Sequence, residues 1–131
     1  MKIPSWLNIH HVIAFHEKQL REHGGLHGIQ DKNLLESALT RPQHLFHYEK
    51  PSLFELSAAY AVGIIKNHPF VDGNKRTGIV TAGVFLDINE FELVVPEIEL
   101  YQQVMALAEN NLAENGFSDW LQVNCKKTLR T

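Results

Sequence analysis

Apolar residues recur every three to four positions along most of this chain, which is the spacing of one buried helix face. A first stretch runs from Asn8 to Glu22 and ends at the glycine pair Gly24-Gly25. Asp31 is a good N-cap for a short second helix, and Arg41-Pro42 is expected to stop it. Gln43–Lys50 shows no clear period, so we expect an extended flap there.

The second half of the chain has the same helical spacing, interrupted by short breaks. We expect helices over residues 51–67 and 73–87, an extended stretch at 91–95, a helix from Pro96 to Gly116, and a last helix capped by Ser118. The pattern therefore predicts a mainly α fold, a compact bundle of about six helices with a short extended flap. Residues 1–131 are expected to form a single domain.

Composition narrows the class of protein. The chain has 131 residues, 44% of them hydrophobic, which suffices for a core and argues against disorder. Its formal net charge of −3 does not favour direct binding to nucleic acid. A single cysteine, Cys125, excludes an intrachain disulfide.

The ends of the chain suggest no membrane attachment. Met1–Asn8 has no apolar run of signal-peptide length, and no segment approaches the roughly 18 apolar residues of a membrane span. The basic residues Lys126, Lys127 and Arg130 are interpreted as a solvated helix end. We therefore expect a cytoplasmic protein.

One segment carries most of the candidate chemistry. His68–Gly78 reads HPFVDGNKRTG and lies between the two most apolar helices, which predicts a central place in the bundle. It combines an imidazole, a carboxylate, a flexible turn, an amide and two cations. Those groups are what a metal-bound polyphosphate at a helix start requires, with a base beside it.

Two residues of this segment have alternative interpretations. His68 follows a helix end; it is either a base that takes a proton from an attacking hydroxyl or a helix-terminal histidine bonded to the backbone. Asp72 either caps the next helix or binds Mg²⁺, which prefers one or two carboxylates plus phosphate oxygens. The adjacent Lys75 and Arg76 favour the metal.

The following residues suit an anion. Gly73 permits close backbone approach, and with Asn74 and Lys75 it presents N–H groups reinforced by the helix dipole. Lys75 adds a point charge and Arg76 a forked one. Two cations in a first helical turn oppose the dipole, and an anionic ligand reverses that penalty.

Other histidines do not indicate a zinc site. His10, His11 and His16 lie close in sequence, as do His44 and His47, but no thiolate pair or spaced carboxylates accompany them. We expect His16 to be a buried, hydrogen-bonded helix residue. The chain also lacks a Walker loop, a kinase-type glycine loop and a nucleophile elbow.

The segment His68-x-Phe70-x-Asp72-Gly73-Asn74-Lys75-Arg76 resembles the Fic/Doc signature. Adenylylating members have glycine in place of Lys75 and a second arginine where this chain has Ile79. The chain therefore resembles the death-on-curing (Doc) toxin branch. Further similar segments are Gly24–Gly28, the Asp31 helix and Phe54–Ala58, so the resemblance extends over most of the chain.

The resemblance implies a compact Fic fold and a toxin that transfers the γ-phosphate of ATP to a threonine of elongation factor Tu, stopping translation. It implies that His68 is the base, that Asp72 holds Mg²⁺, and that Gly73, Asn74, Lys75 and Arg76 bind phosphates. It also implies a cognate antitoxin that adds a helix to the fold. Gln43–Lys50 falls where the family has a target-docking flap, with strand addition as the expected mode.

Some features keep other functions open. The Doc branch has alanine in place of Gly73, whereas adenylylating enzymes have glycine, so an AMP transferase acting on a protein hydroxyl is one alternative. A non-enzymatic phosphate-binding regulatory module is another. The chain has no internal inhibitory motif, because Asn110 precedes Glu114-Asn115 where the motif needs serine or threonine. Restraint by a separate antitoxin is therefore favoured.

Overall fold

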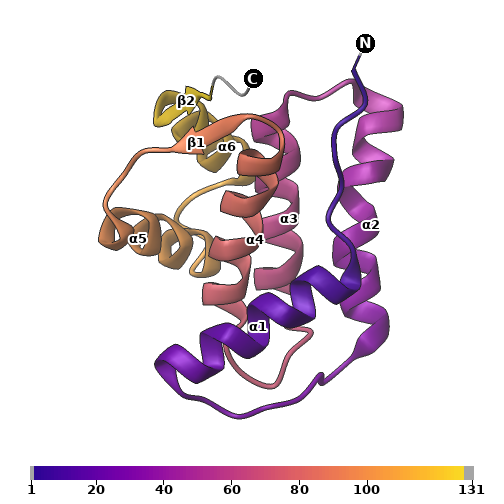
Figure 1. Cartoon of the computed structure of the whole chain (residues 1–131), viewed down its shortest axis with the longest axis vertical. Coiled ribbons are helices and arrows are strands. Elements are labelled where there is room, and N and C mark those ends of the chain that lie inside the picture. Colours follow the sequence, from indigo (N-terminus) through magenta and orange to yellow (C-terminus); the bar gives the residue numbers. More distant parts are fainter. Residues whose placement is uncertain (1, 129–131) are drawn as a thin grey trace.

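The computed structural model describes residues 2–128 (Figure 1). Within this range the chain forms six helices and two short strands. They are α1 (Ile9–His23), α2 (Lys32–Glu49), α3 (Leu53–Asn67), α4 (Asn74–Ile88), β1 (Phe91–Leu93), α5 (Glu97–Ala108), α6 (Glu114–Val123) and β2 (Cys125–Lys127). The predicted mainly α bundle of about six helices is therefore confirmed.

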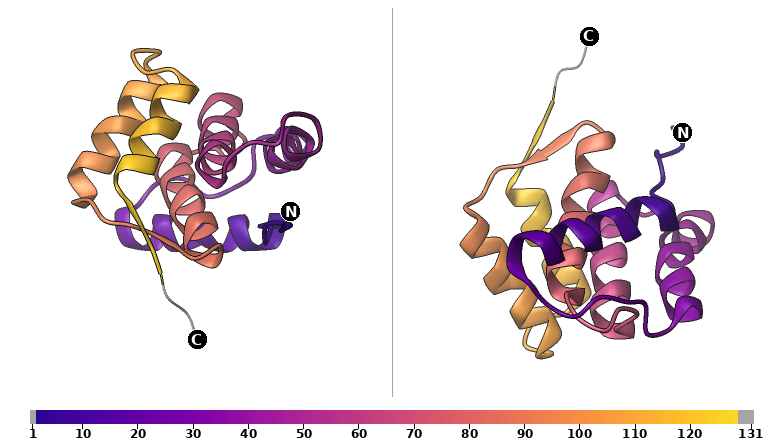
Figure 2. Two further views of the ribbon diagram at one scale, coloured as in Figure 1. Left: turned by 90° about the horizontal axis from the view of Figure 1, so that it is seen from above. Right: turned by 60° about the horizontal axis from the view of Figure 1, so that its bottom comes forward.

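Helix α3 is the centre of the bundle. Its sequence is apolar on every side, as expected for a helix enclosed by neighbours. It packs against α2, α4 and α6, while α1 crosses the ends of the upright helices (Figures 1 and 2). A capping box between Ser52 and Glu55 starts α3, and His68 ends it.

Two apolar clusters lie on either side of the central pair α3 and α4. One joins α1 and α2 to this pair and includes Tyr60 and Phe85; the other joins α5 and α6 to it and includes Phe117. The Tyr60 hydroxyl lies 3.1 Å from the backbone nitrogen of Leu7, which attaches the N-terminal segment to the core. Burial raises the pKa of Tyr60 to about 12. Helices α3 and α4 are thus packed on both sides, and the loop that connects them is anchored at both of its ends by packed helices.

Helices α2 and α3 approach each other closely at Gly63. A Cβ at this position would lie 3.1 Å from both Cα and Cβ of Ala38. We expect Gly63→Leu to lower the free energy of unfolding by about 1–3 kcal/mol, because the added side chain overpacks the contact. Gly83→Leu is the matched control, since a Cβ at this helical glycine meets nothing within 4 Å. Urea unfolding followed by circular dichroism measures both, and equal effects would contradict the prediction.

The predicted stop at Arg41-Pro42 and the predicted extended flap at Gln43–Lys50 are both wrong. Helix α2 continues through Pro42 to Glu49. Proline in a helix interior costs about 3 kcal/mol. Continuation places Leu45 and Phe46 against the first apolar cluster, and Phe46 makes an edge contact with Trp6. Both side chains are half-buried there. Complete burial of one such side chain is worth about 1.5–3 kcal/mol, so their partial burial together offsets much of the penalty.

The C-terminal part differs in its boundaries. Helix α5 ends at Ala108, and Gly116 lies inside α6 instead of closing a helix. The extended stretch beginning at Phe91 is confirmed as β1, which pairs antiparallel with β2. Lys126 and Lys127 lie in β2 and not at a helix end, and Arg130 falls outside the described residues. Among residues 2–128, none of the helices has the length and apolar character needed to cross a bilayer.

Candidate active site

The loop between α3 and α4 forms one wall of an open cavity of about 370 Å³. Every residue predicted to carry the chemistry lines it, together with residues from α1 and α5. The lining residues are His23, Gly24, Gly25, His68, Val71, Asp72, Gly73, Asn74, Lys75, Arg76 and Tyr101. The motif therefore lies at one end of the central helix pair, rather than in the middle of the bundle.

His68 is exposed, and its ring is oriented by Asn74. The residue ends α3 in a left-handed conformation with φ 51°, and its Nδ1 lies 3.1 Å from Asn74 Nδ2. Asn74 is only 3% exposed; its Oδ1 accepts the N–H of Phe70, and its Nδ2 donates to the Phe70 carbonyl. Because a backbone N–H only donates, the amide orientation is determined and His68 Nδ1 accepts. The ring is thus bonded to a side chain, not to the backbone.

The Asp72 carboxylate is held by two backbone N–H groups. Oδ1 accepts from Gly73 at 2.9 Å and Oδ2 from Leu26 at 3.2 Å. Asp72 is not the cap of α4, because Gly73 is the N-cap residue and α4 has no side-chain cap bond. The capping alternative is therefore wrong. The exposed carboxylate lines the cavity and retains lone pairs for a cation.

The first turn of α4 is arranged for an anion. The turn has no acidic residue and no side-chain cap, so its free N–H groups face no internal acceptor. Gly73 precedes it with φ 80°, a conformation that favours glycine. Lys75 and Arg76 follow, half-buried in the cavity wall. Helix dipole, N–H groups and two cations thus converge on one opening.

His16 of α1 contacts the loop between α3 and α4. It is 3% exposed, its Nε2 lies 2.7 Å from the Asp72 carbonyl oxygen, and its ring stacks on Phe70 at 3.8 Å. A Cβ on Gly73 would lie 3.5 Å from the His16 ring. The prediction of a buried, hydrogen-bonded residue is confirmed. His16 ties α1 to the loop that carries Asp72.

Several lining residues lie outside the sequence motif. Gly25 lies against the Asp72 carboxylate, because a Cβ there would lie 2.9 Å from Oδ2. His23 comes from the end of α1 and Tyr101 from α5. The glycine pair was a sequence signal for a turn, but not for its position beside Asp72. Nothing in the sequence marked His23 or Tyr101.

The remaining histidines and the candidate inhibitory glutamate take no part in this cavity. Among residues 2–128 no group of three or more histidine, cysteine, aspartate or glutamate side chains is arranged to hold a metal. His11 belongs to the capping box of α1. Glu114 binds Arg41 at 2.8 Å and lines a separate cavity, away from Arg76.

Comparisons with known proteins agree with this geometry. Residues 6–86 match the sequence profile of the Fic/DOC family. The chain is 33% identical over 112 residues to a protein of Escherichia phage P1 named "Protein kinase doc", covering 85% of this chain and 88% of that one. It is 39% identical over 72 residues to "Toxin Doc" of Mycolicibacterium smegmatis, covering 53% and 55% respectively.

Proposed function

The chain belongs to the Fic/DOC family, in its Doc branch, and we propose that it is a Doc-like toxin of a toxin–antitoxin pair. Its proposed activity is that of an ATP-dependent protein kinase, which transfers the γ-phosphate to a threonine hydroxyl of elongation factor Tu and so blocks translation. The main structural support for this proposal is the cavity, in which an imidazole, a carboxylate and two cations surround an uncapped helix N-terminus. The relative named as a protein kinase supports the activity.

Asp72 fits a magnesium site completed by the substrate. It offers one carboxylate, and no further cluster of ligating side chains lies within residues 2–128. Mg²⁺ is commonly held by one or two carboxylates, phosphate oxygens and water. Bound Mg²⁺ would neutralise phosphate charge. Lys75, Arg76 and the first N–H groups of α4 would hold the polyphosphate beside it.

The proposed transfer is an in-line displacement. The threonine oxygen forms a bond to the γ-phosphorus while the bond to the β–γ bridging oxygen breaks, so ADP is the leaving group. The hydroxyl proton passes to His68. Positioning and charge neutralisation do most of the work in such reactions.

The contact with Asn74 sets a condition on His68 as a base. With Nδ1 accepting, the neutral ring carries its proton on Nε2. For Nε2 to take the threonine proton, the ring must hold its own proton on Nδ1, and the Asn74 contact must open. Opening it costs about one hydrogen bond, roughly 0.5–1.5 kcal/mol. Substrate binding would have to supply this small amount.

The presence of glycine at position 73 does not require that the protein is an adenylylating enzyme. Its φ of 80° favours glycine, and a Cβ there would lie 3.4 Å from the Leu20 side chain and 3.5 Å from the His16 ring. A glycine here therefore reflects the backbone of the turn. Ile79, where adenylylating enzymes have a second arginine, lines a small cavity next to Arg76 and adds no charge. Phosphate transfer is thus favoured over AMP transfer.

An antitoxin would find a partly apolar groove outside the active-site cavity. A cavity of about 430 Å³ between the N-terminal segment and α2 is lined by the apolar residues Trp6, Leu7, Ile9 and Leu39 and by the polar residues Asn8, Glu36, Thr40 and Gln43. An amphipathic helix laid into an apolar groove is a common mode of recognition. This is where we expect an added antitoxin helix to dock.

Intact-mass analysis of elongation factor Tu incubated with this protein and Mg·ATP tests the function. We expect a mass gain of one phosphate on one threonine, and no gain when the cognate antitoxin is present. A gain of one adenylate would instead support the AMP transferase. If no protein of a whole lysate is labelled by ATP, the non-enzymatic binding module is the better explanation.

A further inference from the structure

Arg76 is contacted by two residues outside the sequence motif. Its guanidinium carbon lies 5.0 Å from the centre of the Tyr101 ring, a cation–π arrangement. Its Nη1 lies 3.4 Å from His23 Nε2. His23 comes from the end of α1 and Tyr101 from α5, so two separate elements converge on one side chain of α4.

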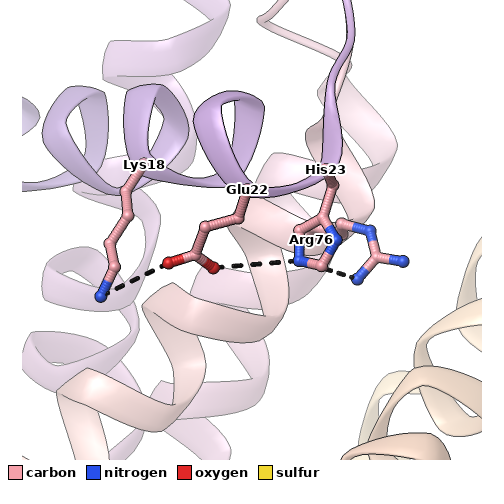
Figure 3. Close-up of polar contacts among 4 residues, drawn as sticks. All are labelled: Lys18, Glu22, His23 and Arg76. Atoms are coloured by element: carbon pink, nitrogen blue, oxygen red, sulfur yellow. Dashed lines mark hydrogen bonds and ion pairs between the residues drawn. The ribbon is translucent and has the colours of Figure 1, made fainter.

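These contacts extend along α1. Figure 3 shows Lys18 paired with Glu22, Glu22 beside His23, and His23 beside Arg76. The guanidinium has donors only, so His23 Nε2 must accept and the ring must be neutral with its proton on Nδ1. The 3.9 Å contact of the same Nε2 with the Glu22 carboxylate requires instead a proton on Nε2, because the carboxylate only accepts. The two partners therefore compete for one atom, and the shorter contact is that with Arg76.

Two unfavourable effects act on the Arg76 side chain in this position, and contacts with neighbours can offset them. An arginine side chain has many rotamers, and ordering it for an anion costs conformational entropy. At the N-terminus of α4, the dipole and Lys75 both repel its charge. The Tyr101 ring and His23 Nε2 provide attractive contacts while leaving Arg76 in the cavity wall.

We propose that His23 and Tyr101 are positioning residues that hold Arg76 in place for the polyphosphate. The inference rests on the proposed function only in taking Arg76 as a phosphate-binding residue. It requires no particular protein target and no particular transferred group. It can therefore be tested by binding alone.

The test is calorimetric binding of Mg·ATP and of inorganic pyrophosphate to the full chain. We expect His23→Ala and Tyr101→Leu each to raise the Kd about three- to tenfold. His23→Gln keeps an acceptor and Tyr101→Phe keeps the ring, so both should recover most of the affinity. Controls are His10→Ala, exposed near the start of α1, and Gln102→Leu, exposed next to Tyr101.

A double-mutant cycle separates positioning from a general effect on the fold. In an Arg76→Ala background, His23→Ala and Tyr101→Leu should each change Kd by less than about twofold. Equal losses in both backgrounds would overturn the inference, as would a wild-type protein that binds neither probe.

The ¹⁵N chemical shift of His23 Nε2 should also change on Arg76→Ala; an unchanged shift argues against the contact. A protein that binds pyrophosphate but transfers nothing contradicts the proposed function and leaves this result standing.

Discussion

Replacing His68 with alanine should lower the rate of phosphoryl transfer by about 10²–10⁴-fold, the usual contribution of a general base. The ring lies exposed in the cavity, with Nε2 as the nitrogen not turned to Asn74. Without it, no imidazole of the loop remains to take the hydroxyl proton. ATP affinity should change little, because phosphate binding is assigned to α4. Intact-mass kinetics on elongation factor Tu measures the rate, and calorimetry measures the affinity.

The fold should survive this substitution, and a second variant separates the loss of the imidazole from the effect on the backbone. His68 has a left-handed backbone, which costs alanine about 1 kcal/mol, whereas asparagine adopts it readily. His68→Asn should therefore be equally inactive but more stable. His47→Ala, at an exposed position of α2, is the matched control. Undiminished transfer by both His68 variants would remove the base assignment.

Asp72→Asn should lower transfer by about a hundredfold or more, since metal stabilisation of transferred charge is worth several kcal/mol. The amide oxygen can still accept from one of the N–H groups of Gly73 and Leu26, so the loop should be retained. The charge that we propose to attract Mg²⁺ is lost. Rates measured against Mg²⁺ concentration should show a much weaker response than in the wild type.

The matched control for this change is Asp31→Asn. Asp31 caps α2 by accepting from the Leu34 N–H, and asparagine caps equally well. This variant should keep both its stability and its Mg²⁺ response. If Asp72→Asn retains the wild-type Mg²⁺ response, Asp72 is not the metal ligand.

Local sequence was sufficient where the interacting groups are close in the chain. His68, Asp72, Lys75 and Arg76 are separated by at most eight positions, so one turn followed by one helix brings them together. The spacing of apolar residues likewise identified α1, α3 and α4, since each buries a face of its own. His16 was identified as buried for the same reason, because it lies on the apolar face of α1.

Local rules failed where packing elsewhere outweighed them. Pro42 by itself indicates a helix end, but α2 continues and packs the partly buried Leu45 and Phe46 against the first apolar cluster. The prediction of a flap at Gln43–Lys50 depended on that helix end and is wrong for the same reason. Next to the cavity lies instead the segment after α1, where Ile29 forms a β-bridge with Phe70 and the Leu26 N–H holds Asp72.

The sequence by itself therefore determined the helical class of this protein, its family signature and the set of groups that we propose to surround a polyphosphate. Only the tertiary structure decided that the Leu26 N–H and His16 hold Asp72, and that His23 and Tyr101 contact Arg76. The reason is that helix periodicity and turn preference act over a few residues. These contacts join positions dozens of residues apart, and only the packing of α1, α4 and α5 brings them together.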